Sequence, residues 1–203
     1  MYSDYPNLIQ KNSDGSFEYL VSFFYRSKRT RFLLGISIDG ADSMKNIYNF
    51  YVGKSGFPNY WSKFRKLSNG SPANPILLIF DNEQNSDRPL KQFLKYIGNK
   101  TLLGSSYWCH LDKNIYIVTC PLVNGARECE IEDLFTKEVL AHKIGGKSFD
   151  RKSTDNTKYY GKAIFSTYIA SNYMNIDFSQ FKDFLESIDN AIKDYRINVM
   201  KTL

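Results

Sequence analysis

The sequence predicts an α/β fold in which helices flank a parallel sheet, with a β-hairpin before the sheet and a helical extension after it. Two continuous apolar segments of strand length, 75–80 and 114–122, are typical of strands buried on both faces. Between them, Pro89 and Gly98 bound a segment with helical periodicity. This order of strand, helix and strand is typical of a parallel β-α-β unit.

The segments before this unit predict the hairpin and two further helices. Residues 16–27 are rich in aromatic side chains and follow the turn signal Ser-Asp-Gly, and 31–38 form a second apolar run, so the two are expected to pair as strands. Asp42 or Ser43 is a suitable N-cap for a helix, and 60–67 predicts a short basic helix.

The last third of the chain predicts helices. One is expected from about Ile131 to the pair of glycines at 145–146. Two more are expected over 162–170 and 178–199, where apolar residues at helical spacing indicate a core or docking face.

We therefore expect two units. Residues 1–145 would form the α/β domain, and 146–203 would form a basic loop followed by the C-terminal helical extension.

Composition limits the function classes. The chain has 203 residues, a formal net charge of +6 and a pI near 9.0, which permits a polyanionic partner without requiring one. Its three cysteines form no CxxC pair, which fits a reducing cytoplasm and argues against a zinc site. No apolar run approaches the ~20 residues of a membrane helix, so we expect a cytoplasmic protein without a membrane partner.

Two acids follow the first apolar strand. Asp81 comes directly after it, and Glu83 would point to the same side of an extended segment. Working residues of parallel sheets sit at the carboxyl ends of strands, and closely spaced carboxylates are stabilised by a hard divalent cation. The alternative is that both are ordinary turn residues.

A second acidic group and two lysines are further candidates. Glu132 and Asp133 belong to an acidic segment, although acids also favour the start of a helix. Lys147 and Lys162 each adjoin a glycine, where a phosphate can approach the backbone, and Tyr160 near Lys162 offers a ring for base stacking. The alternative is that the lysines are solvated surface residues.

The fragments NPILLIFDNE, NIYIVTCPLVNG, EIEDLF, GGKSF, YYGKAIF and NIDFSQF occur in one order along the chain. Over about 31–195 this series resembles the C-terminal Toprim-type region of retron reverse transcriptases and its stand-alone relatives. The resemblance implies a four-stranded parallel core and a nuclease, dependent on Mg²⁺ or Mn²⁺, that acts as the toxic effector of an anti-phage system.

The resemblance also assigns residues. Asp81 and Glu83 match the family's DxD motif, with Glu in place of the second Asp. Glu132 and Asp133 match its IED segment, so these four acids are the implied catalytic residues. The lysines at GK positions, with the tyrosine beside the second, are the implied nucleic-acid contacts: Lys147, Tyr160 and Lys162.

The family's first motif, EGxxD, has no clear counterpart. IDGADSMKNIY is one degenerate match, which makes Asp39 a third metal ligand. The alternative alignment, which we favour, places this segment between the two motifs and the glutamate upstream of Met1.

Two functions follow from these observations. The first is a metal-dependent nuclease effector that cleaves RNA or DNA. The second is a non-catalytic module that binds a reverse transcriptase or its RNA–DNA product, the msDNA. Either is compatible with a homo-oligomer.

Overall fold

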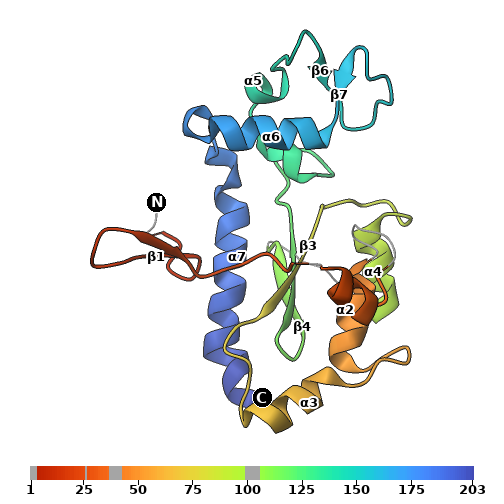
Figure 1. Ribbon diagram of the computed structural model, residues 1–203, viewed down its shortest axis with the longest axis vertical. Coiled ribbons are helices and arrows are strands. Elements are labelled where there is room, and N and C mark those ends of the chain that lie inside the picture. The colour runs from red at the N-terminus through yellow and green to blue at the C-terminus, as the bar shows by residue number, and fades with distance from the viewer. Residues whose placement is uncertain (1–3, 26, 37–42, 99–105) are drawn as a thin grey trace.

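The computed structural model describes residues 4–25, 27–36, 43–98 and 106–203 (Figure 1). Asp39, the predicted third metal ligand, lies outside these residues. The strands are β1 Ile9–Lys11, β2 Phe17–Tyr19, β3 Ile76–Phe80, β4 Trp108–Asp112, β5 Ile115–Thr119, β6 Ser148–Phe149 and β7 Tyr159–Tyr160. The α-helices are α1 Lys28–Leu33, α2 Ser43–Val52, α3 Tyr60–Ser68, α4 Pro89–Ile97, α5 Lys137–Leu140, α6 Lys162–Asn172 and α7 Lys182–Asp194. Shorter 3₁₀ or π-helical turns cover Ile131–Leu134, Tyr173–Asn175, Ser179–Phe181, Tyr195–Val199 and Met200–Thr202.

The central sheet is small and mixed. Its strand order is β3-β5-β4, with β3 parallel to β5 from the pair Ile76–Ile115 to the pair Phe80–Thr119. β4 runs antiparallel to β5. The α/β class is therefore confirmed, whereas the structure does not confirm a Toprim-like parallel sheet.

β4 is the strand of the central sheet that the sequence prediction missed. A tight turn joins it to β5, with Lys113 in the left-handed region at φ 53°. Because the apolar pattern of β4 is interrupted by His110 and Asp112, it lacks the continuous run that identified the other two strands.

Helices cover both faces of this sheet (Figure 1). Along β5, Ile115 and Ile117 pack towards α2 and α4, while Tyr116 and Val118 pack towards α7. Because both faces of β5 are buried against helices, all of its side chains lie in a core, and its sequence is continuously apolar. α4 matches its prediction, since Pro89 starts it and Gly98 ends it at φ 74°.

The N-terminal hairpin forms between different segments from those predicted. β1 pairs with β2 in the register Ile9–Tyr19, so only part of 16–27 is a strand. Residues 28–33 are the helix α1, which overlaps the expected second strand, 31–38, at residues 31–33. The Ser27 side chain accepts a hydrogen bond from the Thr30 backbone N–H, and this cap outweighs the β-propensity of the segment.

The predicted helix from Ile131 to the glycines is wrong in extent. A 3₁₀ turn over Ile131–Leu134 ends at Phe135, whose backbone is extended, and Thr136 then caps the four-residue helix α5. The last two predicted helices are present as α6 and α7. α7 begins four residues later than expected because a 3₁₀ turn precedes it.

Candidate functional site

Two acidic segments meet at the carboxyl end of β3. Asn82 and Cys129 form an isolated antiparallel bridge, with N–H to carbonyl distances of 2.8 and 2.9 Å. The buried Asn82 amide also donates to the carbonyl of Cys120 at 3.0 Å. The chain after β5 therefore returns to the end of β3, which brings the acids near 130 beside Asp81 and Glu83.

Asp81 is half-buried, and one of its carboxylate oxygens accepts a bond from the Ile131 backbone N–H at 3.2 Å. Burial raises the pKa of Asp81, and the charges of Glu130 and Glu132 raise it further, whereas the Ile131 N–H and Lys162 oppose the shift. Within the described residues its second oxygen, Oδ2, accepts no hydrogen bond.

Glu83 is the other acid of the β3 end and is only 8% exposed. It forms an ion pair with Arg88, N to O 3.2 Å. Burial raises the pKa of Glu83 and the charge of Asp81 adds to it, so Arg88 only partly compensates. The ionised forms of both acids after β3 are therefore less favourable than they would be in water, and a further cation nearby would stabilise them.

Lys162, the first residue of α6, lies between two glutamates. Its Nζ is 2.9 Å from Glu130 Oε2 and 3.1 Å from Glu132 Oε2, and Glu132 is buried. Burial would lower the pKa of Lys162, but the two glutamates more than offset this and raise it. The sequence predicted Lys162 and Glu132 as candidate site residues but not their contact, and it did not select Glu130.

Arg151 is a residue of this cluster that sequence reasoning missed. Its guanidinium donates to both Asp133 oxygens, at 2.6 and 3.2 Å, and lies 3.4 Å from Glu130. Burial raises the pKa of Asp133, but Arg151 and the Glu130 backbone N–H lower it by more. A single arginine in a polar loop gives no pattern that sequence analysis detects.

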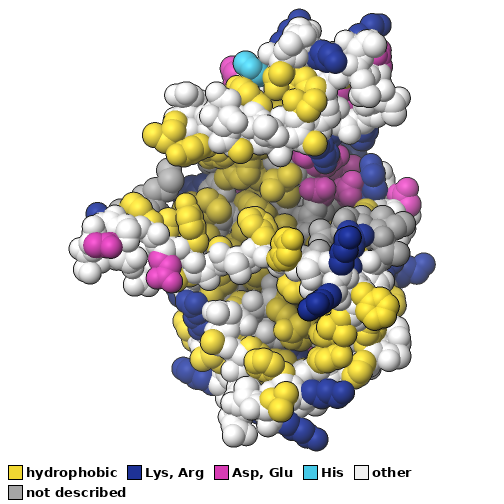
Figure 2. Space-filling view, viewed as in Figure 1, with side chains coloured by type: hydrophobic (Ala, Val, Ile, Leu, Met, Phe, Trp, Pro, Cys, Tyr) yellow, Lys and Arg dark blue, Asp and Glu magenta, His cyan; other side chains and the backbone are white. Residues whose placement is uncertain are grey.

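Carboxylates outnumber cations in this cluster, which we call the acidic site. Figure 2 shows its Asp and Glu side chains between the lobe that contains α6 and the body below it. Six acids and three bases make up the acidic site: Asp81, Glu83, Glu128, Glu130, Glu132, Asp133, Arg88, Arg151 and Lys162. Three formal negative charges therefore remain uncompensated among them when all are ionised.

Oxygen donors of this type suit Mg²⁺, which commonly takes one or two protein carboxylates together with phosphate oxygens. Among the residues that the structure describes, no group of three or more His, Cys, Asp or Glu side chains is arranged to hold a metal ion. Of the four acids that the sequence predicted as catalytic, Glu83, Glu132 and Asp133 each form an ion pair with a basic side chain, and Asp81 accepts a hydrogen bond from a backbone N–H.

The predicted nucleic-acid contacts do not form one surface. Lys162 lies in the acidic site, while Lys147 donates to the backbone carbonyl of Asn156 at 2.6 Å. Tyr160 is 3% exposed, and its hydroxyl donates to the carbonyl of His142. In this conformation Tyr160 has little ring surface for base stacking.

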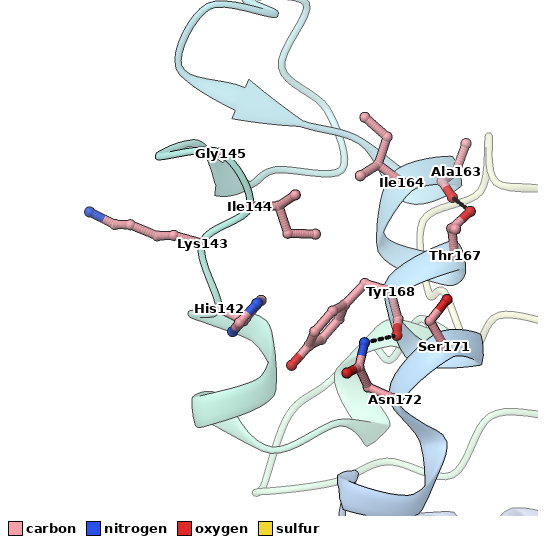
Figure 3. Close-up of a pocket in the computed structure, with 10 residues that line it drawn as sticks. All are labelled: His142, Lys143, Ile144, Gly145, Ala163, Ile164, Thr167, Tyr168, Ser171 and Asn172. Atoms are coloured by element: carbon pink, nitrogen blue, oxygen red, sulfur yellow. Dashed lines mark hydrogen bonds between the residues drawn. The ribbon is translucent and has the colours of Figure 1, made fainter.

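A separate groove of about 750 Å³ lies between the α5 end and α6 (Figure 3). The His142 ring stacks on Tyr168 there, with 4.2 Å between ring centroids. No carboxylate lines this groove, so it is distinct in chemistry from the acidic site.

Across the described ranges, none of the helices combines the length and the apolar character that crossing a membrane requires.

No protein-family model matches this chain, and no solved structure matches it significantly.

Proposed function

We propose that this chain is a Toprim-like, metal-dependent nuclease, the effector module of a retron-type anti-phage system. One observation carries the proposal. Asp81 directly follows the parallel strand β3, has a raised pKa, and lies near the carboxylates of Glu130 and Glu132. The order of motifs along the sequence supports the assignment to phosphodiester cleavage.

In this proposal Asp81 and Glu83 hold Mg²⁺ or Mn²⁺. The bound ion would neutralise charge on a phosphate and lower the pKa of a bound water. Lys162 and Arg151 are positioned to pair with phosphate oxygens if they release their carboxylates, because both already carry stable positive charge. Glu132 and Asp133 act as positioning residues that keep these two cations at the acidic site.

A second candidate is a non-catalytic module that binds a reverse transcriptase or its RNA–DNA product. The ion pairs favour it, since Arg88, Lys162 and Arg151 already engage Glu83, Glu130, Glu132 and Asp133. In this second candidate the ion pairs stabilise four of the six carboxylates without a metal ion.

A cleavage assay separates the two functions. Labelled RNA, DNA and RNA–DNA hybrid are incubated with the protein in Mg²⁺, Mn²⁺ or EDTA. We expect cleavage only with metal, and a loss of at least about 100-fold in Asp81→Asn. Asp155→Asn, a change at an exposed aspartate outside the acidic site, is the matched control and should cleave normally. Tight binding to the hybrid without cleavage would instead support the second candidate.

A further inference from the structure

An exposed aromatic segment connects the N-terminal hairpin to α2. Val21 to Tyr25 has no regular secondary structure and leads into α1. Phe23 is 97% exposed, Tyr25 83% and Phe32 90%. Large aromatic side chains at such exposure are uncommon unless they contact a partner. We call residues 21–33 the aromatic arm.

The arm is also basic. The sequence has no acid between Glu18 and Asp39, but it has four basic residues: Arg26, Lys28, Arg29 and Arg31. Lys28 and Arg29 are exposed at the start of α1, between the rings of Tyr25 and Phe32. A basic cluster therefore lies between exposed aromatic rings on its two sides in the sequence.

We infer that the aromatic arm binds single-stranded nucleic acid, with bases stacked on its rings and phosphates paired with its basic side chains. Unpaired bases expose the faces that aromatic rings stack on, whereas duplex bases do not. A basic cluster with exposed rings on both sides fits this ligand, whereas binding at a membrane surface would need an amphipathic helix with separate apolar and charged faces. α1 has six residues, too few for such a helix.

The arm and the acidic site are visible on the same face of the molecule. In Figure 1 it is the red segment that crosses the front of the molecule, and Figure 2 shows Lys and Arg side chains below the acidic group on that same face. A strand bound along the arm would thus lie on the face where cleavage is proposed. The inference adds a substrate class to the proposed function and rests on it for the site of cleavage.

Binding is measured by fluorescence anisotropy of labelled single-stranded RNA and DNA, with duplexes of the same sequence, in EDTA. We expect single strands to bind at least tenfold more tightly than duplexes, which corresponds to a difference in binding free energy of about 1.4 kcal/mol. Phe23→Leu, Tyr25→Leu and Phe32→Leu keep apolar area but remove the ring, and each should weaken binding by at least about fivefold. Tyr173→Leu, at an exposed ring near the end of α6, is the matched control and should bind normally.

The salt dependence of binding tests the contribution of the basic side chains separately. Lys28→Gln with Arg29→Gln should reduce the slope of log affinity against log salt by about 0.7 for each charge. Circular dichroism of each variant is the control that checks whether it remains folded. Tyr25→Phe, which keeps the ring, should retain wild-type affinity.

Several results would overturn the inference. These are no binding of single strands, equal binding of duplexes, or ring-to-leucine variants with unchanged affinity. Binding to anionic vesicles, or self-association lost in the same variants, would count against it if oligonucleotides do not bind. Because EDTA removes metal, binding in this assay with no cleavage in Mg²⁺ would leave the arm's role intact and refute the nuclease alone.

Discussion

Asp81 is unusual among the acids of this chain because its environment favours the neutral form. Burial, and then neighbouring carboxylates, raise its pKa above the ordinary value of 3.8. The folded state therefore binds its proton more tightly than the unfolded state does. Its contribution to stability falls as pH rises from about that ordinary value through the folded pKa.

Asp81→Asn should thus stabilise the metal-free protein at pH 7, by up to about 1 kcal/mol, and this gain should vanish at a pH below 3.8. Urea unfolding at several pH values measures it. Asp155→Asn is the control of opposite sign, because hydrogen bonds from Thr157 lower the pKa of Asp155 and its removal should destabilise at neutral pH. A less stable Asp81→Asn at pH 7 would contradict the electrostatic account.

Lys162 tests the ion pairs of the acidic site. Lys162→Met leaves Glu130 and the buried Glu132 without this cation, which should destabilise the fold by about 1–2 kcal/mol after allowance for exposure. Burial raises the pKa of Glu130, but Lys162 and Arg151 lower it by more, so the stability from pairing is present above the ordinary pKa of 4.5 and is lost at lower pH.

A double-mutant cycle with Glu132→Gln measures the coupling between Lys162 and Glu132. Urea unfolding should show that the double variant recovers part of the loss at pH 7. Additive effects of the two changes would show that the pair contributes nothing to stability.

The sequence could predict those parts of the acidic site that a local sequence pattern marks, but not contacts between residues far apart in the chain. Asp81 and Glu83 follow an apolar strand directly, a local pattern that sequence reasoning detects. Arg151 contacts Asp133 across 18 residues of chain, and no local pattern marks such a contact. The metal ligand proposed at Asp39 stays a prediction.

The long C-terminal helix provides one face of the core. α7 and its π-helical extension place Phe184, Ala191 and Tyr195 against the sheet residues Tyr116 and Val118 (Figure 1). The helical spacing of apolar residues predicted this buried face, because a period of 3.6 is directly visible in sequence. The partner of the face was not predictable, since that depends on sheet topology.

Tyr195 is the most informative residue of this packing. It is fully buried, its ring meets Tyr116 edge to face at 6.4 Å, and its hydroxyl donates to the carbonyl of Pro72. Tyr195→Ala should cost about 3–5 kcal/mol through lost burial and an unpaired carbonyl. Chemical denaturation measures the loss.

Tyr173→Ala is the matched control, since this tyrosine is largely exposed, and it should change stability by less than about 0.5 kcal/mol. Equal effects of the two substitutions would mean that α7 does not pack on the sheet as described.

Strand prediction succeeded where burial on both faces leaves a continuous apolar run. β3 and β5 have such runs, and both lie between helices. β4 and the hairpin strands are partly exposed, so polar side chains interrupt their patterns. The expected all-parallel sheet was inferred from strand and helix order, and the turn at Lys113 is what makes β4 antiparallel instead.

Across the whole molecule, the acidic site joins parts of the chain that are distant in sequence. Asp81 and Glu83 belong to the sheet, the acids near 130 to the segment after β5, and Lys162 and Arg151 to the C-terminal third. A ligand that binds there would stabilise the contact between the α6 lobe and the sheet, because it binds only the folded arrangement.

Direct binding of Mn²⁺, followed by electron paramagnetic resonance of the free ion, tests whether the acids after β3 hold a divalent cation. The account predicts one Mn²⁺ bound per chain in the wild type, weakened at least about tenfold by Asp81→Asn and unchanged by Asp155→Asn. Absence of Mn²⁺ binding in the wild type, or equal binding in Asp81→Asn, would contradict it.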